Sequence, residues 1–195
     1  MDSKRVLDLT VGSVAMAVAA PILAGVAMAM RLSGDRGPFL YRARRLGEGA
    51  SIITVLKVRT MSEGAGGSSL TMSGDPRVTP LGRLLRRYRI DELPQLVNVV
   101  RGDMSLVGPR PEDPSFADLS DPLHRRVFSA KPGITGPAQL TYRDEARFLT
   151  GPDIERRYRE EILPAKLLLD ARYLDERSTW LDLRIVAQTI GAIAR

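Results

Sequence analysis

The stretch Asp91-Glu92-Leu93-Pro94-Gln95-Leu96-Val97-Asn98-Val99-Val100-Arg101-Gly102 decides the fold around the candidate site. Two adjacent carboxylates precede a short apolar run that has a proline near its start and a glycine at its end. This pattern predicts a helix with Asp91 as its N-cap and Gly102 at its end. Backbone N–H groups and the helix dipole favour anions at such a start, so the pKa of Asp91 should be low. Capping alone would also explain this aspartate.

The chain continues as Gly102-Asp103-Met104-Ser105-Leu106-Val107-Gly108-Pro109-Arg110-Pro111. Arg110 lies between two prolines, so its backbone is stiff and its planar guanidinium can be held in place for phosphate. An exposed arginine on a structural turn is the alternative. Asp103 is a third candidate carboxylate, although capping or turn formation is the commoner use. A second rigid turn is predicted over Pro132-Gly133-Ile134-Thr135-Gly136-Pro137.

A low-pKa carboxylate can attack a phosphoanhydride when a divalent cation reduces the repulsion between the two anions. Mg²⁺ suits this role, because one or two carboxylates and substrate phosphate oxygens usually bind it. The chain has a single histidine, His124, and no cysteine. Thiolate zinc sites and cysteine nucleophiles are therefore excluded, and His124 is expected at a surface helix position.

Length and net charge limit the classes of protein and of binding partner that fit this chain. The 195 residues allow one domain plus a membrane element, and a net charge of +6 predicts an acidic partner such as phosphorylated substrate, anionic lipid or nucleic acid. Aromatic residues are 5% of the chain, too few for a stacking platform for single-stranded nucleic acid. Neither a P-loop nor a GxGxxG fingerprint occurs.

Residues 9–30 are uncharged and mostly apolar, and about 20 such residues can cross a bilayer as a helix. Pro21 predicts a kink, and basic residues flank both ends, where each prefers the cytoplasmic side. A straight span and a re-entrant helix that dips into one leaflet both fit. A cleaved signal peptide is a weaker third reading, because the apolar stretch is long for one.

The rest of the chain supports a small α/β domain that is mostly helical. Residues 39–41 and 51–58 predict a β-hairpin, residues 62–75 a mobile loop, and Thr79-Pro80 the start of a helix. Four residues are expected to form the buried stripe of that helix: Leu81, Leu84, Leu85 and Tyr88. Residues 154–173, interrupted at Pro164, and residues 178–193 predict two C-terminal helices that pack on the domain or lie on the bilayer surface.

The motifs together resemble the bacterial sugar transferases, specifically the small monotopic phosphoglycosyl transferases. The resemblance rests on four segments in order, residues 57–61, 91–99, 102–111 and 132–136. It implies transfer of a phosphosugar from a nucleoside diphosphate sugar, usually a UDP-sugar, to polyprenol phosphate, with release of the nucleoside monophosphate. It also implies an aspartyl-phosphosugar intermediate on Asp91, with Glu92 as the second member of the catalytic pair and Mg²⁺ as cofactor, held by Asp91.

The resemblance further predicts the placement of the protein. Residues 1–36 would form a re-entrant anchor and residues 37–195 a cytosolic catalytic domain with interfacial amphipathic helices. The enzyme would lie on the cytoplasmic face of the bacterial inner membrane, in contact with phospholipid and without nucleic acid. The expected phosphate-binding residues are Arg110, Lys57, Arg59, Arg86 and Arg143.

This sequence departs from the family pattern in places. Ala20-Pro21 replaces the usual Ser-Pro of the re-entrant helix, Arg89-Ile90 replaces Ser-Leu before the carboxylates, and residues 141–145 replace a Gly-Arg region. Two alternatives stay open at this point. One is a basic membrane-anchored adaptor without catalysis, and the other is a Mg²⁺-dependent hydrolase of nucleotide sugars.

Overall fold

The computed structural model describes residues 2–64, 66–67, 70–149 and 153–193. Its helices and strands are α1 (Ser3–Leu32), β1 (Leu40–Leu46), β2 (Ile52–Val58), α2 (Pro80–Arg87), α3 (Gln95–Arg101), β3 (Ser105–Val107), α4 (Pro122–Phe128), β4 (Gly133–Thr135), α5 (Pro137–Thr141), α6 (Ile154–Arg157), α7 (Leu163–Glu176) and α8 (Thr179–Ile193). The described part of the chain is mostly helical, as expected, and it contains two small sheets, of which the β1–β2 hairpin was expected. Part of the predicted loop over residues 62–75 lies outside the described residues.

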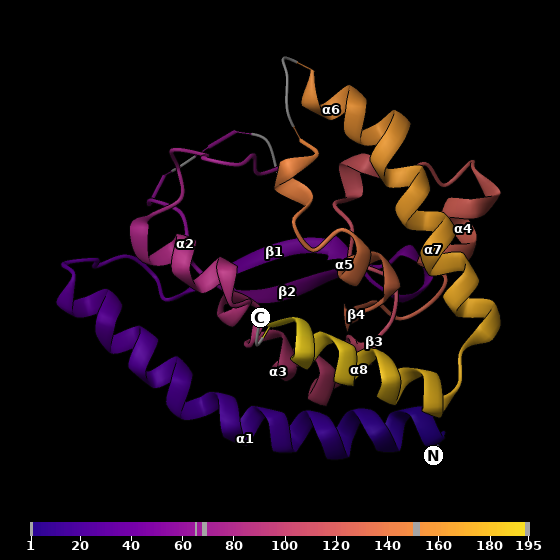
Figure 1. Ribbon diagram of the computed structural model, residues 1–195, viewed down its shortest axis with the longest axis horizontal. Coiled ribbons are helices and arrows are strands. Elements are labelled where there is room, and N and C mark those ends of the chain that lie inside the picture. The colour runs from indigo at the N-terminus through magenta and orange to yellow at the C-terminus, as the bar shows by residue number, and fades with distance from the viewer. Residues whose placement is uncertain (1, 65, 68–69, 150–152, 194–195) are drawn as a thin grey trace.

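Helix α1 runs along one side of the molecule, next to α3 and α8 (Figure 1). The side chain of Asp2 caps its first turn, and the helix continues through Pro21 as a single curved element. By length and composition, α1 is the one helix of the described ranges that could cross a membrane. A membrane anchor therefore fits this helix, and the choice between a span and a re-entrant dip stays a prediction.

The predicted hairpin is confirmed. Strands β1 and β2 pair antiparallel from Leu40 opposite Val58 to Leu46 opposite Ile52. The cross-strand partners Ala43 and Val55 are buried in the main core, whereas Val58 is buried in a separate cluster with Met30 and Leu85. The far edge of β2 meets a side chain: Asn98 of α3 accepts a hydrogen bond from Leu56 N and donates one to Thr54 O, at 3.1 and 2.8 Å.

The start of α3 differs from the sequence prediction. Asp91 is not its N-cap, because residues Ile90–Glu92 form a separate turn of 3₁₀-helix and α3 begins at Gln95 after Pro94. Leu93 keeps helical backbone angles, with φ of −54° and ψ of −35°, so the break comes at Pro94 itself, which has no N–H to continue the hydrogen bonding of the preceding turn. The predicted end is confirmed: Gly102 has φ of 97° and its N–H bonds to Asn98 O.

A parallel pair, β3 and β4, was not anticipated. Ser105 pairs with Gly133 and Val107 with Thr135, so the segment expected to be a second rigid turn is instead a short buried strand leading into α5. The two backbones approach closely because Gly108 and Gly133 lack side chains. A Cβ on Gly133 would lie 2.1 Å from Gly108 N.

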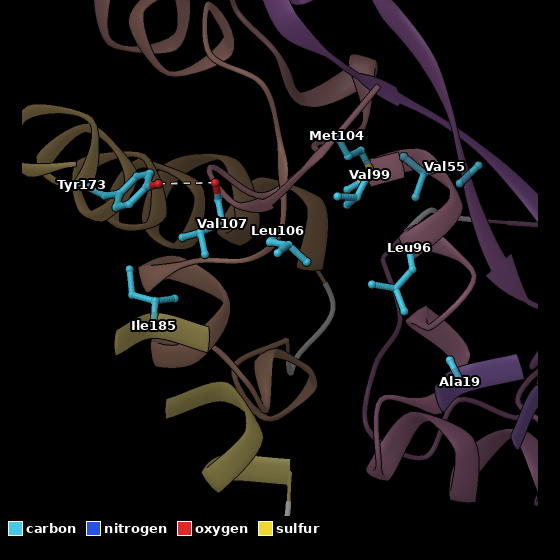
Figure 2. Packing of buried hydrophobic residues seen from close by; sticks show 10 residues of the cluster. Ala19, Val55, Leu96, Val99, Met104, Leu106, Val107, Tyr173 and Ile185 are labelled. Atoms are coloured by element: carbon cyan, nitrogen blue, oxygen red, sulfur yellow. Dashed lines mark hydrogen bonds between the residues drawn. The ribbon is translucent and has the colours of Figure 1, made fainter. Parts of the chain in front are cut away.

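Both C-terminal helices are confirmed in outline. A π-helical turn, Tyr158–Ile162, joins α6 to α7 just before Pro164. This wider turn accommodates the proline, which has no N–H to donate to the preceding turn. Figure 2 shows how α7 and α8 close the core over β3: Tyr173 donates a hydrogen bond to Val107 O, and Ile185 lies nearby.

Two burial predictions are corrected. Helix α2 begins at Thr79-Pro80 as expected, but Leu84 and Tyr88 of its supposed buried stripe are exposed, while Leu85 is buried. The helix has eight residues and packs through one narrow side. His124 is on a helix but is buried, and its Nδ1 accepts a hydrogen bond from Asp118 N. Its role in the described structure is to hold this loop.

Candidate active site

A cavity of about 920 Å³ opens between the hairpin, the turn before α3, and the segments around α5 and α7. Both motifs meet here, although the sequence separates them. Asp91 and Glu92 line the cavity together with Arg110. The cavity is strongly basic, because further lining residues include Lys57, Arg59, Arg86, Arg89 and Arg143. Every residue that was expected to act on phosphate thus lies along one hollow.

Asp91 is the most unusual group in the cavity. It is 7% exposed, and its Oδ1 atom is buried without a hydrogen-bond partner among the described residues. The pKa of Asp91 is raised, first by burial and then by the neighbouring Glu92 carboxylate, while Lys57 and two arginines oppose the shift. The expectation of a low pKa is therefore wrong for the free protein, because the helix start that would have lowered it is absent.

Glu92 is held as an anion. Lys57 Nζ lies 3.1 Å from its Oε1 atom, and Arg89 Nη1 lies 3.4 Å from its Oε2 atom. Although burial opposes the charge, Lys57, Arg89 and Arg110 lower the pKa of Glu92 to about 2. Arg89 has a left-handed backbone with φ of 55°, which is uncommon for a residue with a side chain. Its guanidinium also donates to Arg143 O at 2.8 Å.

Arg110 is fixed at its backbone. Its N–H donates to Asp170 Oδ2 at 3.2 Å. Its guanidinium forms no hydrogen bond or ion pair within the described ranges, although it is well packed. Burial opposes its charge, but the carboxylates of Glu145, Glu92 and Glu112 raise the pKa of Arg110 above its usual value. An unengaged, half-buried guanidinium is suited to bind an anion that enters from solvent.

The other predicted phosphate ligands are less free. Arg86 donates from Nε to Thr60 Oγ1 at 2.8 Å. Arg59 binds Asp35 and the carbonyls of Pro38 and Met61. Arg143 donates to Ala192 O at the end of α8. All three line the cavity, and their binding of phosphate stays a prediction. Asp103 is not a cavity residue; it accepts a hydrogen bond from Asn98.

A buried polar cluster at one end of the cavity was missed by sequence reasoning. Tyr158 donates to Glu112 Oε2, and Lys166 Nζ lies 2.7 Å from both Tyr158 OH and Glu145 Oε1. The three segments that supply these residues are far apart in the chain. The only signal in the sequence was the position of Glu112 directly after the Pro-Arg-Pro turn.

Magnesium binding at Asp91 stays a prediction. No group of three or more His, Cys, Asp or Glu side chains able to hold a metal occurs among the described residues. An all-protein cage is not what Mg²⁺ requires, since one or two carboxylates and phosphate oxygens bind it in many enzymes. The unpartnered Oδ1 atom of Asp91, beside the Glu92 anion, supplies the acceptor that such an ion would take.

Comparison with known proteins agrees with this geometry. The family model described as bacterial sugar transferase matches residues 2–195. The chain belongs to the bacterial sugar transferase family. The transferase is 39% identical over 195 residues to UDP-glucose:undecaprenyl-phosphate glucose-1-phosphate transferase of Caulobacter vibrioides, covering 97% of this chain and 69% of that protein. The family assignment makes it an enzyme and contradicts the alternative of a non-catalytic adaptor.

Two further relatives show how much of each protein this chain covers. Undecaprenyl-phosphate glucose phosphotransferase of Komagataeibacter xylinus is 38% identical, with 97% of this chain and 35% of that protein covered. Exopolysaccharide production protein ExoY of Rhizobium meliloti (strain 1021) is 31% identical, with 98% of the chain and 85% of that protein covered. The transferase thus spans little more than a third of one relative and most of another.

Proposed function

We propose that the transferase moves a phosphosugar from a UDP-sugar to undecaprenyl phosphate, by way of an aspartyl-phosphosugar on Asp91. The observation that carries this proposal is the buried Oδ1 atom of Asp91, which has no partner among the described residues and lines the same basic cavity as Arg110. A carboxylate that is buried without a partner is costly, and such sites are often functional. The names of the relatives support the two substrates.

In the first step a carboxylate oxygen of Asp91 attacks the β-phosphorus of the donor. A new bond joins Asp91 to this phosphorus, and the bond to the α-phosphate oxygen breaks, so UMP leaves with the electron pair. Arg110 would bind the diphosphate, and Lys57 lies close enough to Glu92 to serve both the carboxylate pair and the substrate. When bound, Mg²⁺ would supply charge neutralisation between Asp91 and the donor phosphates.

In the second step an oxygen of undecaprenyl phosphate attacks the same phosphorus. The bond between phosphorus and Asp91 breaks, which regenerates the carboxylate and gives a polyprenyl diphosphate sugar. Glu92 remains an anion throughout and keeps Lys57 and Arg89 in place. The pKa of Asp91 is raised in the free protein. This is consistent with the order of events, because the Mg²⁺ that would arrive with the donor favours the charged form of Asp91.

The attachment of α1 supports a position on one side of the membrane. Near its start, Lys4 pairs with Asp182 and Arg5 donates to Val99 O and Val100 O. Just after its end, Asp35 pairs with Arg59 of the segment that follows β2. A helix of 30 residues is about 45 Å long, enough to cross a bilayer. Both of its ends are tied to the same folded body, and this favours the re-entrant placement on the cytoplasmic face over a straight span.

Exposed apolar side chains support interfacial contact by other helices. Leu84 and Tyr88 of α2, and Trp180, Leu183 and Ile190 of α8, all lie at the surface. Aromatic and aliphatic residues on a basic protein favour the headgroup region of an anionic membrane. Contact with phospholipid is therefore part of the proposal.

The test separates the intermediate from overall turnover. Full-length protein in detergent is incubated with UDP-glucose and Mg²⁺ but no acceptor, and its intact mass is measured. We expect an increase equal to one phosphosugar, lost on addition of undecaprenyl phosphate and absent in Asp91→Asn. The same measurement is repeated with other UDP-sugars, so that an enzyme that prefers a donor other than UDP-glucose is also detected. Release of UMP without any mass increase would contradict the covalent route, and release of free sugar phosphate with acceptor present would indicate a hydrolase.

A further inference from the structure

The wall of the cavity behind Arg110 contains more buried charge than the two proposed chemical steps use. Lys166 has a side chain that is 3% exposed, and its Nζ atom lies 2.7 Å from Glu145 Oε1 and 3.6 Å from Glu112 Oε2. This ammonium is not a surface charge, because it also lies 4.8 Å from the centroid of the Tyr158 ring. This buried lysine between two glutamates lines the same cavity as Arg110.

The two glutamates that Lys166 contacts line the same cavity as Arg110. Glu145 and Glu112 are two of the three carboxylates whose charges act on the Arg110 guanidinium. Yet neither makes an ion pair with Arg110 in the described part of the chain, whereas both lie within 4.0 Å of Lys166. Tyr158 adds to this arrangement by donating a hydrogen bond to the Glu112 oxygen. Both carboxylates are thus engaged by Lys166 or Tyr158, and neither forms an ion pair with Arg110 in the described ranges.

We propose that Lys166 is a positioning residue that occupies Glu112 and Glu145 and so keeps the Arg110 guanidinium free for the diphosphate of the donor. This inference rests on the proposed function, because it assigns Arg110 to the donor. The physical reason is competition in a dry environment. A buried guanidinium beside an unpaired carboxylate pairs with it, and an entering phosphate must then displace that partner.

Glu145 comes from the segment that follows α5, which lines the cavity. Glu145 begins a short 3₁₀ turn, and Lys166 is in the first turn of α7 after Pro164. Glu145 and Lys166 therefore act as a pair: the glutamate brings a charge that would disable Arg110, and the lysine neutralises it.

Binding of UDP with Mg²⁺ tests this directly, because UDP carries the diphosphate of any UDP-sugar and cannot turn over. The Kd is measured by calorimetry on the full chain in detergent. We expect Lys166→Met to weaken binding roughly tenfold or more, the size of one lost charge-assisted hydrogen bond. Lys166→Met/Glu145→Gln should recover most of the loss, and Lys166→Arg part of it. Lys131→Met is the matched control, since Lys131 forms only a 3.9 Å surface pair with Glu48.

Two variants keep the test decisive if Lys166→Met folds poorly. Glu145→Gln alone removes the competitor and should leave the Kd unchanged or lower it, so weaker binding would overturn the proposal. In an Arg110→Met background, Lys166→Met should have little further effect, because it acts through Arg110. Equal Kd values for the parent and a folded Lys166→Met would also refute it. Failure of the parent to bind UDP at all would instead refute the proposed function and this inference together.

Discussion

Replacing Asn98 tests whether one amide side chain fixes the hairpin against the catalytic turn. Asn98 is 1% exposed and bonds to two backbone groups on the free edge of β2, as a neighbouring strand would do. Its Nδ2 atom also lies 3.3 Å from Asp103 Oδ2. Because Leu56 precedes Lys57, this clamp also places the lysine that pairs with Glu92.

The isosteric variant Asn98→Asp isolates the hydrogen-bond pattern from packing. Its carboxylate can still accept from Leu56 N, but it cannot donate to Thr54 O and it faces the Asp103 carboxylate. One lost hydrogen bond contributes about 1 kcal/mol, and an unpaired or repelling partner about 1–3 kcal/mol more. We therefore expect a loss of about 3 kcal/mol in the free energy of unfolding, or about 6–12 °C in Tm for a chain of this size.

The assay is thermal unfolding in detergent, followed by the rate of UMP release from UDP-glucose. Gln188→Glu makes the same amide-to-acid change at an exposed position of α8 and should leave Tm within about 1 °C. The transferase activity of Asn98→Asp should also be lower than that of the parent at temperatures below Tm, because the hydrogen bonds that hold the strand carrying Lys57 are weakened. A Tm no lower than that of the Gln188→Glu control would refute the idea that Asn98 fixes β2.

Two further predictions follow from close packing and from burial. Gly82→Ala should lower the free energy of unfolding by about 1–3 kcal/mol and reduce UMP release. The reason is that a Cβ at Gly82 would lie 2.2 Å from Thr60 O and push α2, with Arg86, outward. Gly191→Ala is the control for thermal unfolding, because a Cβ at Gly191 would have no atom within 4 Å. Burial raises the pKa of Asp170 from 3.8 to about 7, so its contribution to stability is greatest below pH 3.8 and falls as pH rises toward about 7. Asp170→Asn should abolish this decline, and Tm relative to the parent should rise by several degrees between pH 5 and pH 8; a constant difference would contradict it.

The sequence alone determined the local elements whose signals are local. The hairpin over residues 39–58 follows from strand-forming residues around a glycine turn, and α2 begins where Thr79-Pro80 predicts. The end of α3 follows from Gly102. The apolar stretch that became α1 and the candidate pair Asp91-Glu92 were equally visible, because charge and hydropathy patterns do not depend on the rest of the fold.

Prediction from the sequence failed where the local pattern of residues fits more than one structure. Asp91 has the composition of an N-cap, yet Pro94 delays α3 and leaves the aspartate in its own turn. The π-helical turn before Pro164 was invisible for the same reason: its cost depends on what α7 packs against. Leu84 and Tyr88 have the spacing of a buried stripe, and only the position of α2 on the hairpin decided that they face outward.

Only the tertiary structure decided which charges meet. Lys57, Arg110 and Lys166 come from β2, a proline turn and α7, and no spacing in the sequence relates them. Their shared cavity is what buries Asp91 without a partner, holds Glu92 as an anion and surrounds Arg110 with carboxylates. The pKa of a carboxylate follows burial and the distance to other charges, and both are properties of the folded chain. The sequence therefore indicated the candidate reactive groups, and the fold determined the environment that sets their charge.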